Sequence, residues 1–206
     1  MANFVKSNVS YMSPIDLYFQ SFNKKVPLTK EEEEIIRPYL HEKKLRKKQF
    51  ILQEGDVCKQ VAFVAKGVLR KYFINDHGGE GITQFAIEGW TISDLYSFLT
   101  EEPSHFNIDA LEDSELVLMD KPSIEELYIK VPKLETHARK QLTNAYIASE
   151  RRIASMMGMS LEDRYEEINK LHPDIVQRVP QHMLASYMGL TPETLSRVRK
   201  RLSSSK

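Results

Sequence analysis

The sequence is poor in cysteine and has no excess of charge of either sign. Cys58 is the only cysteine in 206 residues, which excludes an internal disulfide framework and an iron–sulfur cluster held by several thiolates. The 29 basic and 29 acidic side chains give a formal net charge of zero. The composition as a whole therefore does not indicate a polyanionic partner, although charge can still be concentrated in one segment.

Long hydrophobic runs are missing as well. The longest apolar stretches are too short to cross a bilayer, and the first residues lack the basic and apolar segments of a secretory signal. We therefore expect a cytoplasmic protein without a membrane partner. A hydrophobic content of 41% over this length fits one large or two small globular domains.

Residues from about 45 to 120 form a series of short β-rich runs. QVAFVAKG and SELVLMD are two of them; they end at glycine or aspartate and show little helical periodicity. Such short, regularly spaced strands predict an antiparallel sandwich or barrel. We expect them to form the core of a first domain over residues 1–132.

Capping signals predict helices on both sides of these strands. Thr29 and Glu32 have capping-box spacing within a helical segment over residues 13–40. Ser123 and Glu126 have the same spacing directly after the last strand, which predicts that a short helix begins there.

A long helix is predicted for residues 133–157, which contain neither proline nor glycine. Moderate-sized residues recur along it at spacings of three and four and form a narrow seam: Leu134, Ala138, Leu142, Ala145, Ser149 and Ile153. The seam predicts either a coiled-coil contact with a second copy or packing of the helix on its own β-domain. Gly158 can leave the helical conformation without strain, and Ser160 with Asp163 gives a new N-cap signal, so we expect a hinge and domain boundary at residue 158.

Positive charge is concentrated near the C-terminus. Residues 175–206 contain six basic side chains and a single acidic one, Glu193, so this segment has a net charge of +5. The remainder of the chain must then carry a net charge of −5. The neutral total conceals a basic tail that can attract a polyanion.

Two short helices are predicted within this basic segment, over residues 181–188 and 192–202. Gly189 supplies the positive φ that ends the first helix. Thr191 is a favourable N-cap residue, and Pro192 falls at the first helical position, where its missing N–H costs nothing. This spacing is typical of a helix-turn-helix.

The second of these helices has an apolar face and a polar face. Glu193 can accept from cytosine, Arg197 can donate two bonds to guanine, and Ser196 can serve either base. A plain solvated helix face is the alternative, but the turn glycine, the cap and the local charge together favour a helix that reads DNA. The candidate DNA-binding residues are Thr191, Glu193, Thr194, Ser196, Arg197, Arg199, Lys200 and Arg201.

The chain resembles the Crp/Fnr-type transcription regulators, the family of the cyclic-AMP receptor protein and the fumarate–nitrate regulator. EGD at 54–56, followed by FVAKGVLRKY with Phe63 and Gly67, resembles the family's β-roll, and ETLSR at 193–197 matches its E-x-x-S-R motif. The resemblance covers nearly the full length and implies an α+β fold: an antiparallel β-roll (jelly-roll) sensor of the cyclic-nucleotide-binding type, a long dimerisation helix, and a helix-turn-helix domain over 158–206. It also implies a homodimer on palindromic double-stranded DNA with TTGA-like half-sites, and RNA polymerase as a partner.

Two stretches depart from the pattern of that family. LHPDIVQRVP leaves little room for the β-hairpin wing, so we expect a reduced wing or none. Ser93 and Asp94 replace the Gly-Glu pair of cyclic-nucleotide-binding members, and the phosphate-binding arginine position falls at Ser104 or His105. Because a charge-assisted phosphate clamp cannot be built from these residues, we expect an effector pocket of unknown specificity here, without cyclic AMP or another cofactor.

Other functions stay open at this point. The β-roll could bind another protein or serve as a constitutive scaffold, and the sequence does not separate these roles from small-molecule sensing. A cupin-type enzyme would need a cluster of His and Glu inside the barrel, whereas residues 45–120 offer only His77 and His105. We therefore expect neither an enzyme nor a metal site.

Overall fold

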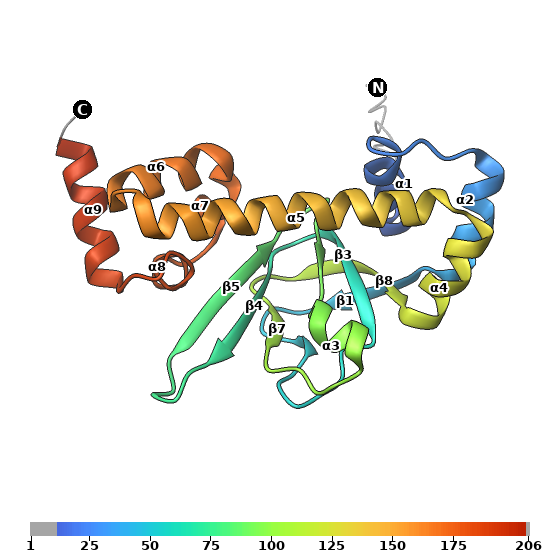
Figure 1. Ribbon diagram of the computed structural model, residues 1–206, viewed down its shortest axis with the longest axis horizontal. Coiled ribbons are helices and arrows are strands. Elements are labelled where there is room, and N and C mark those ends of the chain that lie inside the picture. Colours follow the sequence, from blue (N-terminus) through green and yellow to red (C-terminus); the bar gives the residue numbers. More distant parts are fainter. Residues whose placement is uncertain (1–11, 205–206) are drawn as a thin grey trace, which may run out of the picture.

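The computed structural model describes residues 12–204, in which a long helix lies along a β-roll and carries helices at both ends (Figure 1). The N-terminal part contains α1 (Pro14–Asn23), α2 (Lys30–Ile36) and a short 3₁₀ helix, η1 (Arg37–Tyr39). The β-roll consists of β1 (His41–Leu45), β2 (Phe50–Leu52), β3 (Gln60–Lys66), β4 (Leu69–Ile74), β5 (Glu80–Ala86), β6 (Thr91–Ile92), α3 (Leu95–Thr100), β7 (Asn107–Ala110) and β8 (Ser114–Asp120). The helices that follow are α4 (Lys121–Lys130), α5 (Lys133–Gly158), α6 (Leu161–Leu171), α7 (Pro173–Arg178), α8 (Gln181–Tyr187) and α9 (Pro192–Ser204).

The β-roll is built from two four-stranded antiparallel sheets, with the strand orders β1-β8-β3-β6 and β2-β7-β4-β5. This confirms the antiparallel sandwich predicted from the short strands. Alternation along β3 and β8 sorts their side chains between two apolar clusters. Val64 and Leu116 point between the sheets, whereas Phe63 and Val117 point toward the helices.

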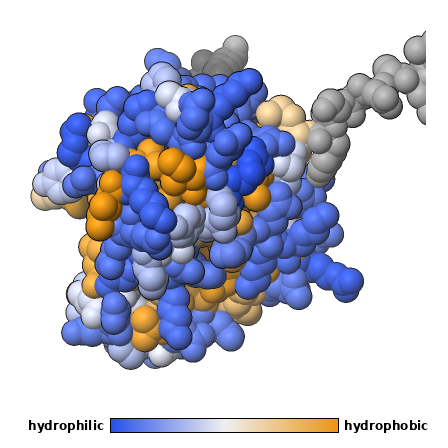
Figure 2. Space-filling view, turned by 90° about the vertical axis from the view of Figure 1, so that its right-hand side faces the viewer, coloured by the Kyte–Doolittle hydropathy of each residue, from blue (hydrophilic) through white to orange (hydrophobic). Residues whose placement is uncertain are grey.

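The helical side of this sheet is covered by α1, α4 and the beginning of α5. Phe19 and Phe22 of α1, Leu127 of α4 and Leu134 of α5 form one buried cluster with Phe63. Outside this cluster, the end of the molecule that carries α1, α2 and α4 is largely hydrophilic, with small separate apolar patches (Figure 2). These helices are thus fixed to the β-roll by apolar burial.

The 26-residue helix α5 has a length of about 39 Å and connects the β-roll to the C-terminal helices. Its end differs slightly from the prediction, because Gly158 is still helical and the break falls at Met159, whose backbone is extended. Ser160 then caps α6 as predicted, accepting a hydrogen bond of 3.1 Å from the Asp163 N–H. The extended conformation that this cap requires explains why the helix ends here.

The capping signals around the β-roll give one confirmation and one correction. The Thr29 hydroxyl accepts from the Glu32 N–H at 3.2 Å, and the Glu32 carboxylate accepts from the Thr29 N–H at 2.7 Å. Ser123, in contrast, does not begin a helix. The Asp120 carboxylate at the end of β8 accepts from the Ser123 N–H at 2.9 Å, so the cap of α4 lies three residues before the predicted one.

The segment where a wing was expected to be reduced or missing forms a helix. Within the described residues, no strand lies between α6 and α8, and α7 occupies this interval. Pro173 stands at the first position of α7, where a proline is tolerated. No helix in the described part of the chain is long and apolar enough to cross a membrane.

Candidate nucleic-acid interface

The turn between α8 and α9 has the geometry that its sequence predicts. Gly189 adopts a φ of +69°, in the left-handed region that glycine enters without strain. The Leu190 N–H donates to the Ala185 carbonyl at 2.8 Å and closes the end of α8. The Thr191 hydroxyl then accepts from the Thr194 N–H at 3.3 Å, which caps the first turn of α9.

A small apolar core holds the two helices at a fixed angle. Ala185 and Leu195 are fully buried where α8 and α9 cross, and Leu184 and Met188 lie beside them in the same cluster. The guanidinium of Arg164, on α6, donates to the Met188 carbonyl at the end of α8. The sequence holds no local signal for this role of Arg164, since its partner is a backbone carbonyl 24 positions along the chain.

The predicted reading face of α9 is exposed. Glu193, Ser196 and Arg197 lie on the solvent side of the helix, opposite the buried Leu195 and Val198. Because the apolar side is fixed in the small core, the polar side has a defined orientation toward solvent. Such a face has the size and chemistry to enter a major groove.

A short chain of hydrogen bonds positions the arginine on this face. Thr191 and Thr194 share a hydroxyl–hydroxyl contact of 3.2 Å, and Arg197 Nη2 donates to Thr194 Oγ1 at 3.3 Å. The pKa of Glu193 lies below its ordinary value because its carboxylate accepts from its own backbone N–H and from Thr191, with a smaller contribution from Arg197. The Glu193 carboxylate is therefore ionised at neutral pH.

The basic residues after Arg197 fall into two groups. Arg199 and Lys200 are exposed and form no ion pair with a carboxylate of residues 12–204. Arg201 instead pairs with Glu162 of α6 at 2.6 Å. Two of these three candidate DNA-binding side chains thus extend from α9 without an ion pair, while the third also ties α9 to α6.

The residues of the predicted seam on α5 lie in three different environments. Leu134 is only 4% exposed and packs in the chain's own core, so its assignment to a dimer seam is wrong. Ala138 is partly buried, and Ala145 and Ser149 line a cavity next to the β-roll. Leu142 and Ile153 are about half exposed, at 48% and 53%.

Two residues that the seam omitted extend the exposed apolar stripe on α5. Tyr146 and Met157 are 67% and 85% exposed, and each lies one helical turn after a predicted seam residue, Leu142 or Ile153. These four side chains form the α5 stripe. Helical periodicity alone predicts a seam that lies too close to the β-roll, because periodicity does not show which side of α5 is covered by the rest of the chain.

The four predicted effector-pocket residues do not form an open site. The Ser104 hydroxyl donates to the Asp94 carboxylate at 2.8 Å, and both side chains are buried. Ser93 is half-buried, and its carbonyl accepts from Lys71 Nζ at 3.3 Å, whereas His105 is exposed to solvent. Asp94 and Ser104 are thus paired with each other, and neither supplies a positive charge for a ligand phosphate.

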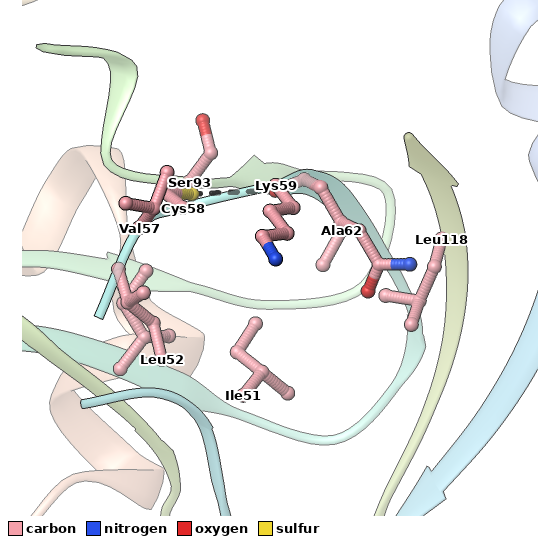
Figure 3. Close-up of a pocket in the computed structure, with 10 residues that line it drawn as sticks. Ile51, Leu52, Val57, Cys58, Lys59, Ala62, Ser93 and Leu118 are labelled. Carbon is pink, nitrogen blue, oxygen red and sulfur yellow. Dashed lines mark hydrogen bonds between the residues drawn. The ribbon is translucent and has the colours of Figure 1, made fainter. Parts of the chain in front are cut away.

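A hollow of about 330 Å³ opens beside Cys58 and the predicted pocket residue Ser93, with Ile51 and Leu52 on its opposite side (Figure 3). The Cys58 thiol donates to the Gln60 carbonyl at 3.5 Å, and burial raises the pKa of the thiol. A reactive thiolate is therefore disfavoured at this position. Among residues 12–204, no group of three or more His, Cys, Asp or Glu side chains is placed to hold a metal ion.

The C-terminal helices are docked on the β-roll through α7 and α8. Arg178 forms ion pairs with Glu88, at 2.7 Å, and with Glu112. The Ser186 hydroxyl accepts from the Ile82 N–H at 3.1 Å and donates to the Glu80 carbonyl at 2.6 Å, both on the outer edge of β5. These polar contacts surround a buried cluster that includes Phe85, Ile175 and Val179.

The architecture and several comparisons identify the class of protein. Residues 42–130 match the family model of the cyclic nucleotide-binding domain. FixK2 from Bradyrhizobium japonicum has the same fold, with a TM-score of 0.66 at 19% identity over 81% of this chain and 85% of that one. The protein therefore combines a cyclic-nucleotide-binding-type β-roll with a C-terminal helical domain.

Relatives in sequence are regulatory proteins. The chain is 26% identical to the regulatory protein HlyX of Actinobacillus pleuropneumoniae over 79% of this chain and 72% of that protein. It is 25% identical to the fumarate and nitrate reduction regulatory protein of Vibrio cholerae over 87% of this chain and 77% of that protein. These comparisons support a Crp/Fnr-type transcription regulator, the class that the motifs predict.

Proposed function

We propose that the protein acts as a homodimer that reads palindromic DNA with α9 of each copy. The observation that carries this proposal is that α9 is buried on one side only. Leu195 and Val198 are fully buried, whereas Glu193, Ser196 and Arg197 are exposed. Arg197 would donate to guanine, Glu193 would accept from cytosine, and Ser196 would contact either. Arg199 and Lys200, with Arg201 where it leaves Glu162, would contact phosphates.

The dimer would form along the α5 stripe. Leu142, Tyr146, Ile153 and Met157 expose apolar surface on one side of α5, and the C-terminal helices lie together at one end of it (Figure 1). Two α5 helices that pair in parallel would bring both copies of α9 to the same end. This arrangement suits two half-sites separated by about one turn of DNA.

We further propose that the β-roll senses an effector and that RNA polymerase is another partner of the protein. Cyclic AMP would not be the effector, because Asp94 and Ser104 are paired with each other and supply no cation for a phosphate. Gly158 and Met159 would provide the hinge through which the β-roll and α5 move the DNA-binding helices.

The DNA-binding role can be tested by fluorescence anisotropy with a TTGA-type palindrome and a scrambled duplex across a salt series. We expect Arg197→Ala to lose about 1–3 kcal/mol of binding to the palindrome and little on the scrambled duplex. Lys200→Ala should weaken both duplexes alike and reduce the salt dependence. Lys47→Ala, in the turn after β1, serves as the exposed control. Equal losses on both duplexes for Arg197→Ala would show that Arg197 does not read a base.

The dimer can be tested separately by sedimentation. Leu142→Glu places a charge in the α5 stripe and should produce monomers, which would then bind single half-sites only. Ile147→Glu is the matched control, because Ile147 is similarly exposed but lies on another side of α5. A Leu142→Glu protein that remains dimeric would exclude the α5 stripe as the interface.

A further inference from the structure

The hollow beside Cys58 lies between the two sheets of the β-roll. Leu52 of β2 and Ile108 of β7 line it from one sheet. Ala62 of β3 and Leu118 of β8 line it from the other. Among the described residues, none of α5 or of the C-terminal helices lines it, and it shares no lining residue with the cavity next to α5. It is therefore a separate space within the β-roll.

A short outer strand and a small side chain leave this space. Strand β2 has only three residues, and its pairing with β7 shifts register between Phe50 and Leu52. Because β2 is an outer strand of its sheet, no further strand of that sheet closes the sandwich on this side. Ala62 points between the sheets, as Val64 does, but its methyl group fills less volume. The resulting 330 Å³ is within the range of pockets that hold small organic molecules.

The walls of the hollow are mainly aliphatic: Ile51, Leu52, Val57, Ala62, Ile108 and Leu118. Leu52, Ile108 and Leu118 are buried members of the apolar core between the sheets, so the hollow continues into that core. No aromatic side chain of residues 12–204 lines it, and a ligand ring would find no ring to stack on. Such walls suit a linear alkyl chain.

One cation accompanies these apolar walls. The Lys59 side chain extends into the space toward Ile51 (Figure 3). Its ammonium group forms neither an ion pair nor a hydrogen bond with another residue of the described part of the chain. No Asp or Glu of residues 12–204 lines the hollow, whereas the Gln60 amide does and can donate a hydrogen bond. A positive charge beside an apolar space favours a ligand with an anionic head and an apolar tail.

We propose that this hollow binds a medium-chain fatty carboxylate, with the alkyl chain between the two sheets and the carboxylate on Lys59. Each methylene that leaves water against Leu52, Ile108 and Leu118 would add to the affinity. Of the residues predicted for an effector pocket, only Ser93 lines the hollow. The proposal goes beyond the DNA-binding role and does not depend on which DNA the protein reads.

Isothermal titration calorimetry of the full chain with octanoate tests the proposal. Octanoate should bind saturably, and hexanoate should bind about tenfold more weakly because its chain is two methylenes shorter. Octanamide has the same chain and a similar shape without the charge. It should bind about three- to fivefold more weakly than octanoate, the size expected for an ion pair near the surface.

Variants of the cation test the position of the carboxylate. Lys59→Gln should weaken octanoate binding about three- to fivefold and remove the difference between octanoate and octanamide. Lys59→Arg keeps the positive charge and should retain most of the affinity. Lys43→Gln is the matched control, because Lys43 is an exposed lysine of β1 that does not line the hollow, and it should leave binding unchanged.

A variant of the wall tests the position of the alkyl chain. Ile51→Phe places a larger side chain at a half-buried wall position and should weaken octanoate binding at least tenfold by occupying its space. Ile74→Phe makes the same change at an exposed isoleucine of β4 outside the hollow and should have no effect. In spectra of the natural protein, octanoate should shift the amide resonances of Cys58 and Ile108. The comparison of octanoate with hexanoate tests the same point without any substitution.

Three results would overturn the proposal: no saturable heat from octanoate up to about 10 mM, equal affinities for octanoate and hexanoate, or unchanged octanoate affinity in either Lys59→Gln or Ile51→Phe. The titration contains no DNA. A failure here is therefore distinguishable from a failure of the proposed DNA recognition.

Discussion

The two ends of the β-roll are attached to their helices in different ways. At one end, α1, α4 and the beginning of α5 share an apolar cluster with the sheet, in which Phe22, Leu127 and Leu134 are almost completely buried. At the other end, α7 and α8 cover a smaller cluster, and Arg178 and Ser186 add ion pairs and hydrogen bonds around it. Water can replace such polar contacts at little cost, so the C-terminal end is the one able to change position.

The largest expected effect tests the apolar end. Leu134→Ala should reduce the free energy of unfolding by about 2–4 kcal/mol, because it leaves a cavity in a fully buried cluster. Leu171→Ala, at an exposed leucine that ends α6, should change it by less than about 0.5 kcal/mol. Urea denaturation of both variants provides the measurement. Similar losses of unfolding free energy in the two variants would contradict the stronger attachment of α1, α4 and the beginning of α5 to the β-roll.

A second, smaller effect concerns pH at the same end. His137 stacks on Phe22 with ring centres 4.0 Å apart, and burial, with the charges of Lys25 and Lys140, lowers its pKa to about 4. Between about pH 6.5 and this value the unfolded chain binds a proton that the folded chain rejects. The free energy of unfolding should therefore fall as the pH is lowered through that window, by about 1–2 kcal/mol after solvent screening.

Substitution of the histidine isolates its share of this pH effect. Denaturation curves of His137→Gln between about pH 7 and pH 4 should show a shallower loss of stability than the natural protein. His105→Gln changes an exposed side chain and is the control. An unchanged slope in His137→Gln would mean that other groups cause the acid sensitivity.

The smallest expected effect tests the C-terminal end. Arg178→Ala removes two partly exposed ion pairs and should lower the global free energy of unfolding by no more than about 1 kcal/mol. Hydrogen exchange should nevertheless become faster in α7 and α8, because their docking opens more often. Lys44→Ala, which removes an exposed pair with Glu115, should leave exchange in these helices unchanged. Exchange that stays slow in Arg178→Ala would show that the apolar cluster alone holds them.

Local signals predicted most of the fold. The turn at Gly189, the cap at Thr191 and the capping box at Thr29 depend on residues a few positions apart, and the structure has all three. The cap of α4 was misassigned because Asp120 and Ser123 are both good cap residues, and only the end of β8 decides between them.

Features that depend on distant segments were not predictable in the same way. Leu134 and Leu142 belong to one helical periodicity, yet the first is in the core and the second is about half exposed, because α1 and α4 cover only the beginning of α5. Lys71 and Arg152 lie 81 positions apart in the sequence and meet only through the docking of α5 on β4 and β5. The sequence contains both cations but no local sign that they share a cavity.

The contact of Ser186 with β5 has a consequence for solubility. β5 is one of the two outer strands of its sheet, and unpaired backbone groups on an outer strand can recruit a strand from another molecule. The Ser186 hydroxyl occupies two of these groups, at Glu80 and Ile82, whenever α8 is docked. Movement of the C-terminal helices would expose this edge, so the docked state also protects the protein against aggregation through its own sheet.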